Sequence, residues 1–256
     1  MPLNTPIHDW SAKRVWVIGA STGIGAAIAR ELLARGARVA VSARRGQAAG
    51  TLPAADRMLD LPLDVTVPET VHAAARTVIE RFGQLDLVLV VAGTHEAMRA
   101  QDWSLDRARR LLEVNLHGVL NCLDAVLPIL RAQRAGGVAI FSSIAGYAGL
   151  PKALVYGPSK AALINLAESL YGDLHPEGIG VYLVNPGFVD TPLTARNDFR
   201  MPSLITAEQA AAQTLRGIER GLFEIHYPKR FTLGFKLLRL LPYRLQFWLV
   251  RRITGG

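Results

Sequence analysis

The chain has 256 residues, half of them hydrophobic, and its 29 basic and 21 acidic side chains give a net charge of +8. This length and apolar content predict a single α/β domain with a substantial core. One cysteine, Cys122, excludes an internal disulfide and is typical of a protein in a reducing compartment. Residues 1–13 contain no apolar run, so we expect no secretory signal there.

The first predicted unit is a strand, a helix and a second strand. Arg14–Ile18 and Arg38–Ser42 are short apolar runs, and a helical pattern lies between them at 26–35. The strands of such a βαβ unit are parallel. A glycine-rich segment joins the first strand to the helix: Gly19, Ala20, Ser21, Thr22, Gly23, Ile24 and Gly25. Here glycines let the backbone approach a pyrophosphate at the positive helix N-terminus, which predicts a dinucleotide loop rather than an ordinary turn.

Two arginines, Arg44 and Arg45, follow the second strand, where the adenosine ribose of a dinucleotide would lie. An acid at this place suits the ribose hydroxyls of NAD, whereas a cation suits the 2′-phosphate of NADP. We therefore predict NADP(H) in preference to NAD(H). Two solvated arginines at the end of a strand are the alternative.

Asp64 ends a short apolar segment, 61–65, before a predicted helix at 69–82. It is placed either to cap that next element or to bond an adenine amino group. The apolar run 85–91 predicts a strand covered on both faces. A helix containing Asn115 follows, and a polar group in such apolar surroundings usually bonds backbone.

The strand Gly137–Phe141 leads to Ser143, which precedes Tyr156 by thirteen residues. Tyr156 and Lys160 are four residues apart, so they share one helix face. A phenol with a pKa of about 10 is a poor base at neutral pH, and a nearby ammonium favours its ionised form. Ser143 could then hold a substrate oxygen while Tyr156 gives or takes a proton. Alone, the pair is weak evidence and fits an ordinary helix face better, and the upstream cofactor loop is what favours the catalytic interpretation.

The last part of the domain continues the alternation of strands and helices. A strand at 180–184 is broken by the segment 185–192, and 193–205, which has no clear periodicity, is expected to form a loop over the site. A helix at 207–220 and a strand at 223–226 follow. All proposed site residues thus fall at or after the carboxyl ends of strands, where open parallel sheets bind ligands.

These ordered motifs resemble the classical short-chain dehydrogenase/reductase family over about residues 13–227. The resemblance implies a Rossmann-like doubly wound parallel sheet, NAD(P) dependence and hydride transfer between the cofactor and a carbonyl or alcohol. It implies that Tyr156 is the general acid/base, Lys160 the ribose anchor that lowers the pKa of Tyr156, and Ser143 the group that polarises the carbonyl. Asn115 would hold a water that links Lys160 to solvent.

The resemblance also implies contacts between the cofactor and residues beyond the glycine loop. The adenine would meet Asp64 and Val65, and the rest of the cofactor would meet Ala92, Gly93, Tyr156, Lys160, Pro186, Gly187, Val189 and Thr191. One departure is Val90-Val91-Ala92-Gly93, where the family usually has Asn-Asn-Ala-Gly, and it bears on the rigidity of the central sheet more than on the chemistry. Family members commonly form dimers or tetramers through the helices that carry Asn115 and Tyr156, so we expect a homodimer or homotetramer.

Residues 228–256 form a basic amphipathic extension beyond the catalytic domain, 1–227. From 226 onward there are seven Lys and Arg residues but no Asp or Glu, and apolar residues alternate with them on both sides of Pro242. This predicts two short amphipathic helices, too charged to span a membrane, that lie at a membrane surface. Docking on its own or a partner subunit is the alternative. The extension is too apolar for a nucleic-acid-binding arm, so we expect no nucleic-acid partner.

The favoured function is an NADPH-preferring reductase or dehydrogenase of the carbonyl or alcohol group of a moderately apolar or lipid-like small molecule. We expect it to be cytoplasmic, peripheral on the inner face of the membrane. The alternatives are an NAD-dependent alcohol dehydrogenase of the same fold and a non-catalytic, membrane-associated module that binds the cofactor.

Overall fold

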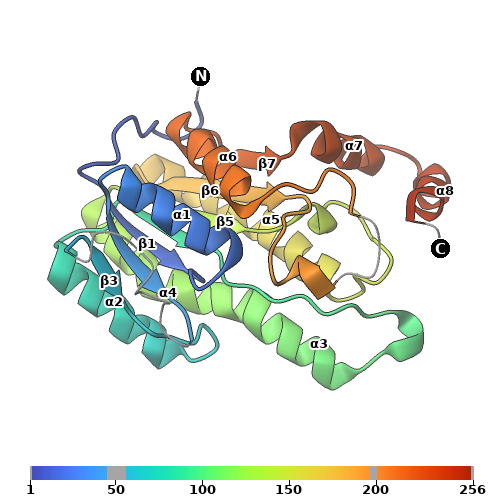
Figure 1. The fold of residues 1–256 in the computed structure, drawn as a ribbon, viewed down its shortest axis with the longest axis horizontal. Helices are drawn as coiled ribbons and strands as arrows, with labels where there is room; N and C mark the ends of the chain where they lie inside the picture. The colour runs from blue at the N-terminus through green and yellow to red at the C-terminus, as the bar shows by residue number, and fades with distance from the viewer. Residues whose placement is uncertain (1, 45–55, 197–200, 255–256) are drawn as a thin grey trace.

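A parallel sheet forms the centre of the computed structural model, which describes residues 2–44, 56–196 and 201–254 (Figure 1). In this described chain the sheet has seven strands in the order β3-β2-β1-β4-β5-β6-β7, and every neighbouring pair is parallel. The strands are β1 (Arg14–Ile18), β2 (Arg38–Ser42), β3 (Met58–Asp60), β4 (Leu87–Val90), β5 (Gly137–Phe141), β6 (Gly180–Pro186) and β7 (Glu224–Tyr227). The predicted doubly wound α/β fold is confirmed.

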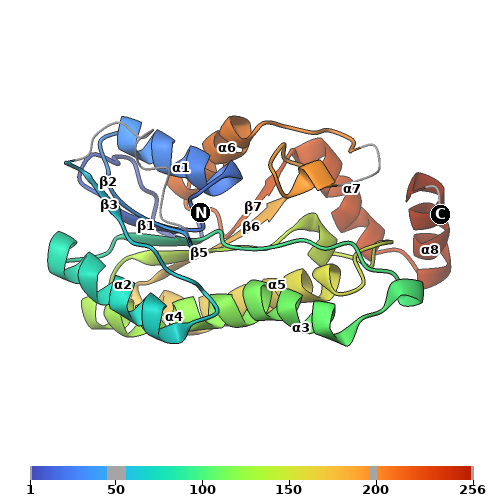
Figure 2. The same ribbon diagram turned by 60° about the horizontal axis from the view of Figure 1, so that its bottom comes forward.

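Helices cover both faces of this sheet. They are α1 (Gly23–Ala34), α2 (Pro68–Phe82), α3 (Leu105–Leu112), α4 (Gly118–Gln133), α5 (Tyr156–Leu174) and α6 (Ala207–Glu219). Figure 2 shows α1 and α6 on one face and α2, α4 and α5 on the other. A short π-helical segment, η3 (Glu113–His117), joins α3 to α4.

Successive strand residues feed two separate cores. In β1, Trp16 and Ile18 are buried in the core beneath α2, α4 and α5, whereas Val15 and Val17 are buried in the core beneath α1 and α6. Because both faces are covered, the strands are apolar along nearly their whole length rather than alternately apolar and polar. Because every neighbouring pair of strands is parallel, the carboxyl ends of the strands lie at one edge of the sheet.

Four strands differ from the prediction. The strands β4 and β7, predicted at 85–91 and 223–226, differ only at their ends. The edge strand β3 (Met58–Asp60) was not predicted, because its three residues are only partly buried and form too short a run to stand out. The strand β6 extends through Pro186 instead of ending at Val184. Its last pair with β5 is Phe141 with Val184, and beyond that it pairs with β7. A proline is tolerated at that position because it stands at the end of the strand.

The segment 193–205 is described in part. Its described residues include a short 3₁₀ turn, η6 (Thr194–Arg196), and a bridge between Val189 and Ile205 that ties the segment to the chain after β6. Phe199 of this segment lies outside the described residues.

The extension forms two helices on either side of Pro242, as predicted: α7 (Lys229–Arg239) and α8 (Tyr243–Thr254). Phe231 and Phe235 of α7 pack against the main core, so α7 docks on its own chain. The helix α8 lies beyond α7 at one end of the molecule (Figures 1 and 2). Among the described helices, none is both long and apolar enough to cross a membrane.

Candidate active site

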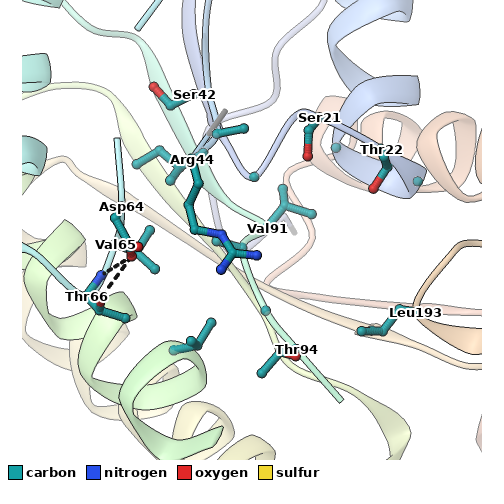
Figure 3. A pocket seen from close by; sticks show the side chains of 18 of the residues that line it. Ser21, Thr22, Ser42, Arg44, Asp64, Val65, Thr66, Val91, Thr94 and Leu193 are labelled. Carbon is teal, nitrogen blue, oxygen red and sulfur yellow. Dashed lines mark hydrogen bonds between the residues drawn. The ribbon is translucent and has the colours of Figure 1, made fainter. Parts of the chain in front are cut away.

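The predicted site residues gather around a cavity of about 630 Å³ where the strand order reverses between β1 and β4 (Figure 3). Crevices at such reversal points are where open α/β sheets bind ligands. The volume suits a ligand of moderate to large size. The predicted cofactor residues that line it are Gly19, Ser21, Thr22, Gly23, Ile24, Gly25, Arg44, Asp64, Val65, Ala92, Gly93 and Thr191.

The glycines of the loop after β1 allow close packing of backbone around the mouth of the cavity. Gly19 has a φ of +97°, and a Cβ on Gly25 would lie 2.2 Å from the carbonyl oxygen of Gly19. A Cβ on Gly23 would lie 2.9 Å from a methyl carbon of Thr191, so the loop touches the segment after β6. No side chain larger than glycine fits at Gly25 unless the loop opens.

The amino end of α1 faces the same cavity. Thr22 is its N-cap residue and, within the described chain, makes no side-chain cap hydrogen bond, and the first turn holds no acid. Free backbone N–H groups and the positive helix end form an anion site. Together with the glycine cradle, these groups fit the pyrophosphate of a dinucleotide.

Arg44 and Asp64 line the part of the cavity that follows β2 and β3, where we expect the adenosine. The Arg44 side chain is exposed and extends into the cavity, between Asp64 on one side and Ser21 and Thr22 on the other (Figure 3). Arg45 lies outside the described residues, so its predicted role is not described.

Asp64 does not cap the following helix, which corrects one of the two expected roles. The N-cap residue of α2 is Val67. One Asp64 oxygen, Oδ1, instead accepts hydrogen bonds from the Thr66 backbone N–H at 2.9 Å and from the Thr66 hydroxyl at 2.8 Å. The carboxylate therefore orders the turn before α2, and the adenine contact stays a prediction.

Ser143, Tyr156 and Lys160 meet at the carboxyl end of β5. Ser143 caps the 3₁₀ turn η4 (Ile144–Gly146), where its Oγ accepts from the Ala145 N–H at 3.2 Å. Tyr156 is the first residue of α5, and the Lys160 Nζ lies 5.8 Å from the centre of its ring. Lys160 is only 5% exposed and donates to the Phe141 carbonyl at 2.9 Å. The structure thus brings Ser143 together with Tyr156 and Lys160, as the sequence predicts.

The direction of the Tyr156 pKa differs from the expectation. Burial raises the pKa of this phenol, and the Ser143 hydroxyl lowers it only in part. Among the protein's own groups, desolvation therefore outweighs the predicted effect of Lys160. The phenol keeps its proton at neutral pH.

Asn115 bonds backbone, as expected for an amide in apolar surroundings. It is fully buried in η3, its Oδ1 accepts from the Thr94 N–H at 2.7 Å, and its Nδ2 donates to the Thr94 carbonyl at 2.9 Å. A Cβ on Gly93 would lie 3.4 Å from Asn115 Oδ1 and 3.5 Å from Lys160 Nζ. Asn115 thus braces the segment after β4 in a chain that lacks the usual asparagine pair, and its water-holding role stays a prediction.

A smaller pocket of about 120 Å³ opens beside Ser143 and Tyr156. Gly187 and Phe188, from the segment after β6, line it together with Leu193 and Thr194. Because it lies next to Tyr156, the expected proton donor, it is the candidate substrate pocket.

His95 lines this smaller pocket and was missed in the sequence. Its ring meets the Tyr156 ring edge to face, with centroids 4.7 Å apart and planes at 87°. Burial lowers the pKa of His95, which favours the neutral imidazole. The sequence feature that could have identified His95 is its position two residues after Gly93, in the segment that follows β4.

The described residues support neither a metal site nor a cysteine nucleophile. No group of three or more His, Cys, Asp or Glu side chains there is arranged to hold a metal ion. Cys122 is buried, and burial raises the pKa of its thiol to about 12, so this thiol is unreactive at neutral pH.

Lys160 gives the folded protein a pH-dependent stability. Burial lowers its pKa from 10.5 to about 8, so between these values the unfolded chain binds more protons than the folded chain. We expect the free energy of unfolding, relative to that of a Lys160→Met variant, to increase from pH 8 to 10.5 by at most about 1.4 kcal/mol per pH unit. Urea unfolding across this range measures it, and a difference that does not change with pH would contradict the low pKa.

This geometry defines the class of the protein, an oxidoreductase that binds a dinucleotide. A profile of the short chain dehydrogenase family matches residues 13–200, and the chain belongs to that family. An uncharacterized oxidoreductase of Myxococcus xanthus is 33% identical over 244 residues, which cover 91% of this chain and 94% of the relative.

Solved structures of the family have the same fold. A short chain dehydrogenase from Burkholderia cenocepacia in complex with NADP matches with a TM-score of 0.78 and 27% identity, over 90% of this chain and 93% of that one. A second, from Burkholderia phymatum in complex with NAD, matches with a TM-score of 0.79 and 22% identity, over 90% and 94% of the two chains. The protein is an NAD(P)-dependent oxidoreductase.

Proposed function

We propose that the protein is an NADPH-preferring reductase of the carbonyl group of a moderately apolar small molecule. One observation carries this proposal: the dinucleotide cavity has Arg44 at its adenosine side and adjoins, through Leu193, the pocket beside Ser143 and Tyr156. The walls of that pocket include Ile144, Leu150 and Phe188, which suits an apolar substrate. Oxidation of the matching alcohol is the reverse of the same reaction.

Different residues of the chain have different roles in this reaction. The bound nicotinamide supplies the hydride. The N–H groups at the start of α1 hold the pyrophosphate, and Arg44 pairs with the 2′-phosphate. Ser143 donates a hydrogen bond to the substrate oxygen, and Tyr156 gives that oxygen its proton. Because burial raises the pKa of Tyr156, the phenol holds the proton that reduction needs.

We expect the Arg44→Ala variant to lose the preference for NADPH. The guanidinium forms charge-assisted hydrogen bonds with a phosphate that NADH lacks, so its removal should weaken NADPH binding by about tenfold or more and leave NADH binding unchanged. Titration of the wild type and the variant with each cofactor, followed by fluorescence, measures this.

Arg76→Ala is the matched control, because it removes an exposed arginine from α2, away from the cavity. Equal or NADH-favoured binding by the wild type would favour the NAD-dependent dehydrogenase instead. Binding of neither cofactor would overturn the catalytic proposal.

We also propose that the protein is cytoplasmic and that two or four copies assemble through α4 and α5. These helices lie side by side on one face of the molecule, and Leu120 of α4 is 42% exposed there (Figure 2). Small and apolar residues on such a face permit close packing with a second copy. Light scattering of the purified protein measures this, and a monomer at micromolar concentration would contradict it.

Peripheral membrane contact is proposed for the outer part of the extension. Large apolar side chains are exposed on the last turn of α7, on α8 and between them: Leu237, Leu240, Tyr243, Leu245, Phe247 and Trp248. Arg244, Arg251 and Arg252 lie on α8 with them, and no acid is present. Exposed apolar side chains among cations fit the interface of an anionic membrane.

We expect the protein to sediment with vesicles that contain anionic lipid and to remain in solution with neutral ones. The Trp248→Ser variant should bind about tenfold more weakly, because an indole buried in the interface is lost. Trp103→Ser is the matched control, since both indoles are 53% exposed but Trp103 lies before α3. Equal loss in the two variants, or no sedimentation of the wild type, would contradict the contact.

A further inference from the structure

A partly buried carboxylate, that of Glu224, connects three separate parts of the chain. Glu224 of β7 accepts, at Oε1, hydrogen bonds from the Tyr147 hydroxyl and, at 2.9 Å, from Asn185 Nδ2. Its other oxygen, Oε2, accepts from Lys236 Nζ. The Lys236 ammonium also lies 5.9 Å from the centre of the Tyr147 ring. One side chain therefore holds groups from η4, β6 and α7.

Two of these partners stand next to the reacting groups. Tyr147 directly follows η4, the turn that Ser143 caps, and it is only 7% exposed. Asn185 is fully buried and directly precedes Pro186 and Gly187, where β6 ends and the wall of the substrate pocket begins. A shift of the Glu224 carboxylate would therefore move groups on both sides of the substrate pocket, namely the Ser143 turn and the end of β6.

The third partner belongs to the extension, and α7 reaches the pocket by a second path. Phe231 of α7 packs against Phe188, with ring centroids 5.7 Å apart, and Phe188 lines the substrate pocket. A Cβ on Gly187 would lie 3.3 Å from the Phe231 ring. The inner half of the extension is therefore packed against the wall of the pocket.

The contacts of Glu224 with Lys236, Tyr147 and Asn185 depend on one another because all three are made to the same negative charge. Burial alone would raise the pKa of Glu224, but Lys236, Tyr147 and Asn185 together lower it, so the carboxylate stays ionised. The Glu224 and Lys236 side chains are 24% and 34% exposed, and removal of one partner of such a partly buried ion pair leaves the other charge without its compensation. Asn185 Oδ1 has no hydrogen-bond partner among the described residues, so Glu224 is the group that orients this amide.

We propose that Glu224 is a positioning residue that, paired with Lys236, fixes the Ser143 turn and the end of β6 against the substrate. The helix α7 is then a working part of the active site rather than an appendage. This inference rests on the proposed function of Ser143 and Tyr156. It adds a role for Glu224, Tyr147 and Lys236, which lie outside the family motifs.

Steady-state kinetics of Lys236→Met, Tyr147→Phe and the double variant test the proposal. We expect each single change to lower kcat by about tenfold, because a small misplacement of Ser143 slows the chemical step. The dissociation constant for NADPH should change less than kcat, because most of the dinucleotide cavity is lined by the segments after β1, β2, β3 and β4. The double variant should be no worse than the more damaging single variant, because both partners act through Glu224. Lys236→Arg should retain wild-type kcat.

Lys229→Met is the matched control, because it makes the same change at an exposed position of the same helix. Its kcat should equal that of the wild type. Unchanged kcat in Lys236→Met and Tyr147→Phe, or additive losses in the double variant, would overturn the proposal. An Lys236→Met chain that fails to fold leaves Tyr147→Phe and Lys236→Arg to decide the same question.

Hydrogen exchange separates this proposal from the proposed function, because it needs no turnover. Backbone amides of 143–147 and 187–189 should exchange faster in Lys236→Met than in the wild type or Lys229→Met, while those of β1 and α1 should not change. Unchanged exchange in both segments would overturn the positioning role. Faster exchange in a protein that reduces no carbonyl would overturn the proposed function and support the role of Glu224.

Discussion

We expect the Tyr156→Phe variant to lose about 10³-fold in kcat while it binds NADPH as the wild type does. Phenylalanine keeps the aromatic ring, its edge-to-face contact with His95 and the first turn of α5, and it removes only the hydroxyl. Burial raises the pKa of that hydroxyl, so the phenol is protonated at neutral pH and can act as the general acid. Initial rates of NADPH consumption with a panel of apolar aldehydes and ketones measure the effect.

Tyr171→Phe is the control for this experiment. It makes the same change on the same helix, where the Tyr171 hydroxyl donates to the Leu3 carbonyl at 2.8 Å. Its kcat should match that of the wild type. If Tyr156→Phe also retained full turnover, the general acid would be another group, and the non-catalytic cofactor-binding module would become the better description.

The Gly25→Ala substitution should abolish cofactor binding, with a loss of affinity for NADPH of about 100-fold or more. The new Cβ would lie 2.2 Å from the carbonyl oxygen of Gly19 and 3.2 Å from the Cα of Ala20. Both neighbours are backbone, so relief of the clash requires the loop to open and moves its N–H groups away from the pyrophosphate. We expect a destabilisation of about 1–3 kcal/mol as well. Fluorescence titration and urea unfolding measure the two effects.

Gly172→Ala is the matched substitution, because a Cβ at this position of α5 meets no other atom within 4 Å. It should leave NADPH binding unchanged and stabilise the helix by up to about 1 kcal/mol. Wild-type affinity in Gly25→Ala would show that the close approach of this loop to the cofactor is not needed.

Most secondary structure could be predicted because its signals are local. The strands β1, β2 and β5 match their predicted bounds, since each is a continuous apolar run next to a glycine, a charge or a serine. The strand β3 could not be found in this way, because it is short and only partly buried. Pro186 suggested a break, yet β6 continues through it because the residue stands at the strand's end.

In the candidate site, too, some residues could be predicted from local sequence signals and others could not. The glycine loop, Ser143 and the pair Tyr156 and Lys160 are visible as motifs, because the chemistry needs these residue types at short spacings. His95 belongs to no such pattern and is identified only by its ring contact with Tyr156. The direction of the Tyr156 pKa was predicted wrongly, because the helical spacing to Lys160 shows the nearby charge but not the burial that outweighs it.

The sequence by itself therefore determined the parallel α/β fold, the order of the motifs and the two amphipathic helices at the carboxyl end. Only the tertiary structure decided that α7 packs against the substrate pocket while apolar side chains of α8 stay exposed. It also decided that Asp64 orders a turn and that Tyr147 meets Glu224 across 77 residues of chain. The physical reason is that propensity and periodicity act between near neighbours, whereas burial, charge pairing and pKa values depend on residues that only the folded chain brings together.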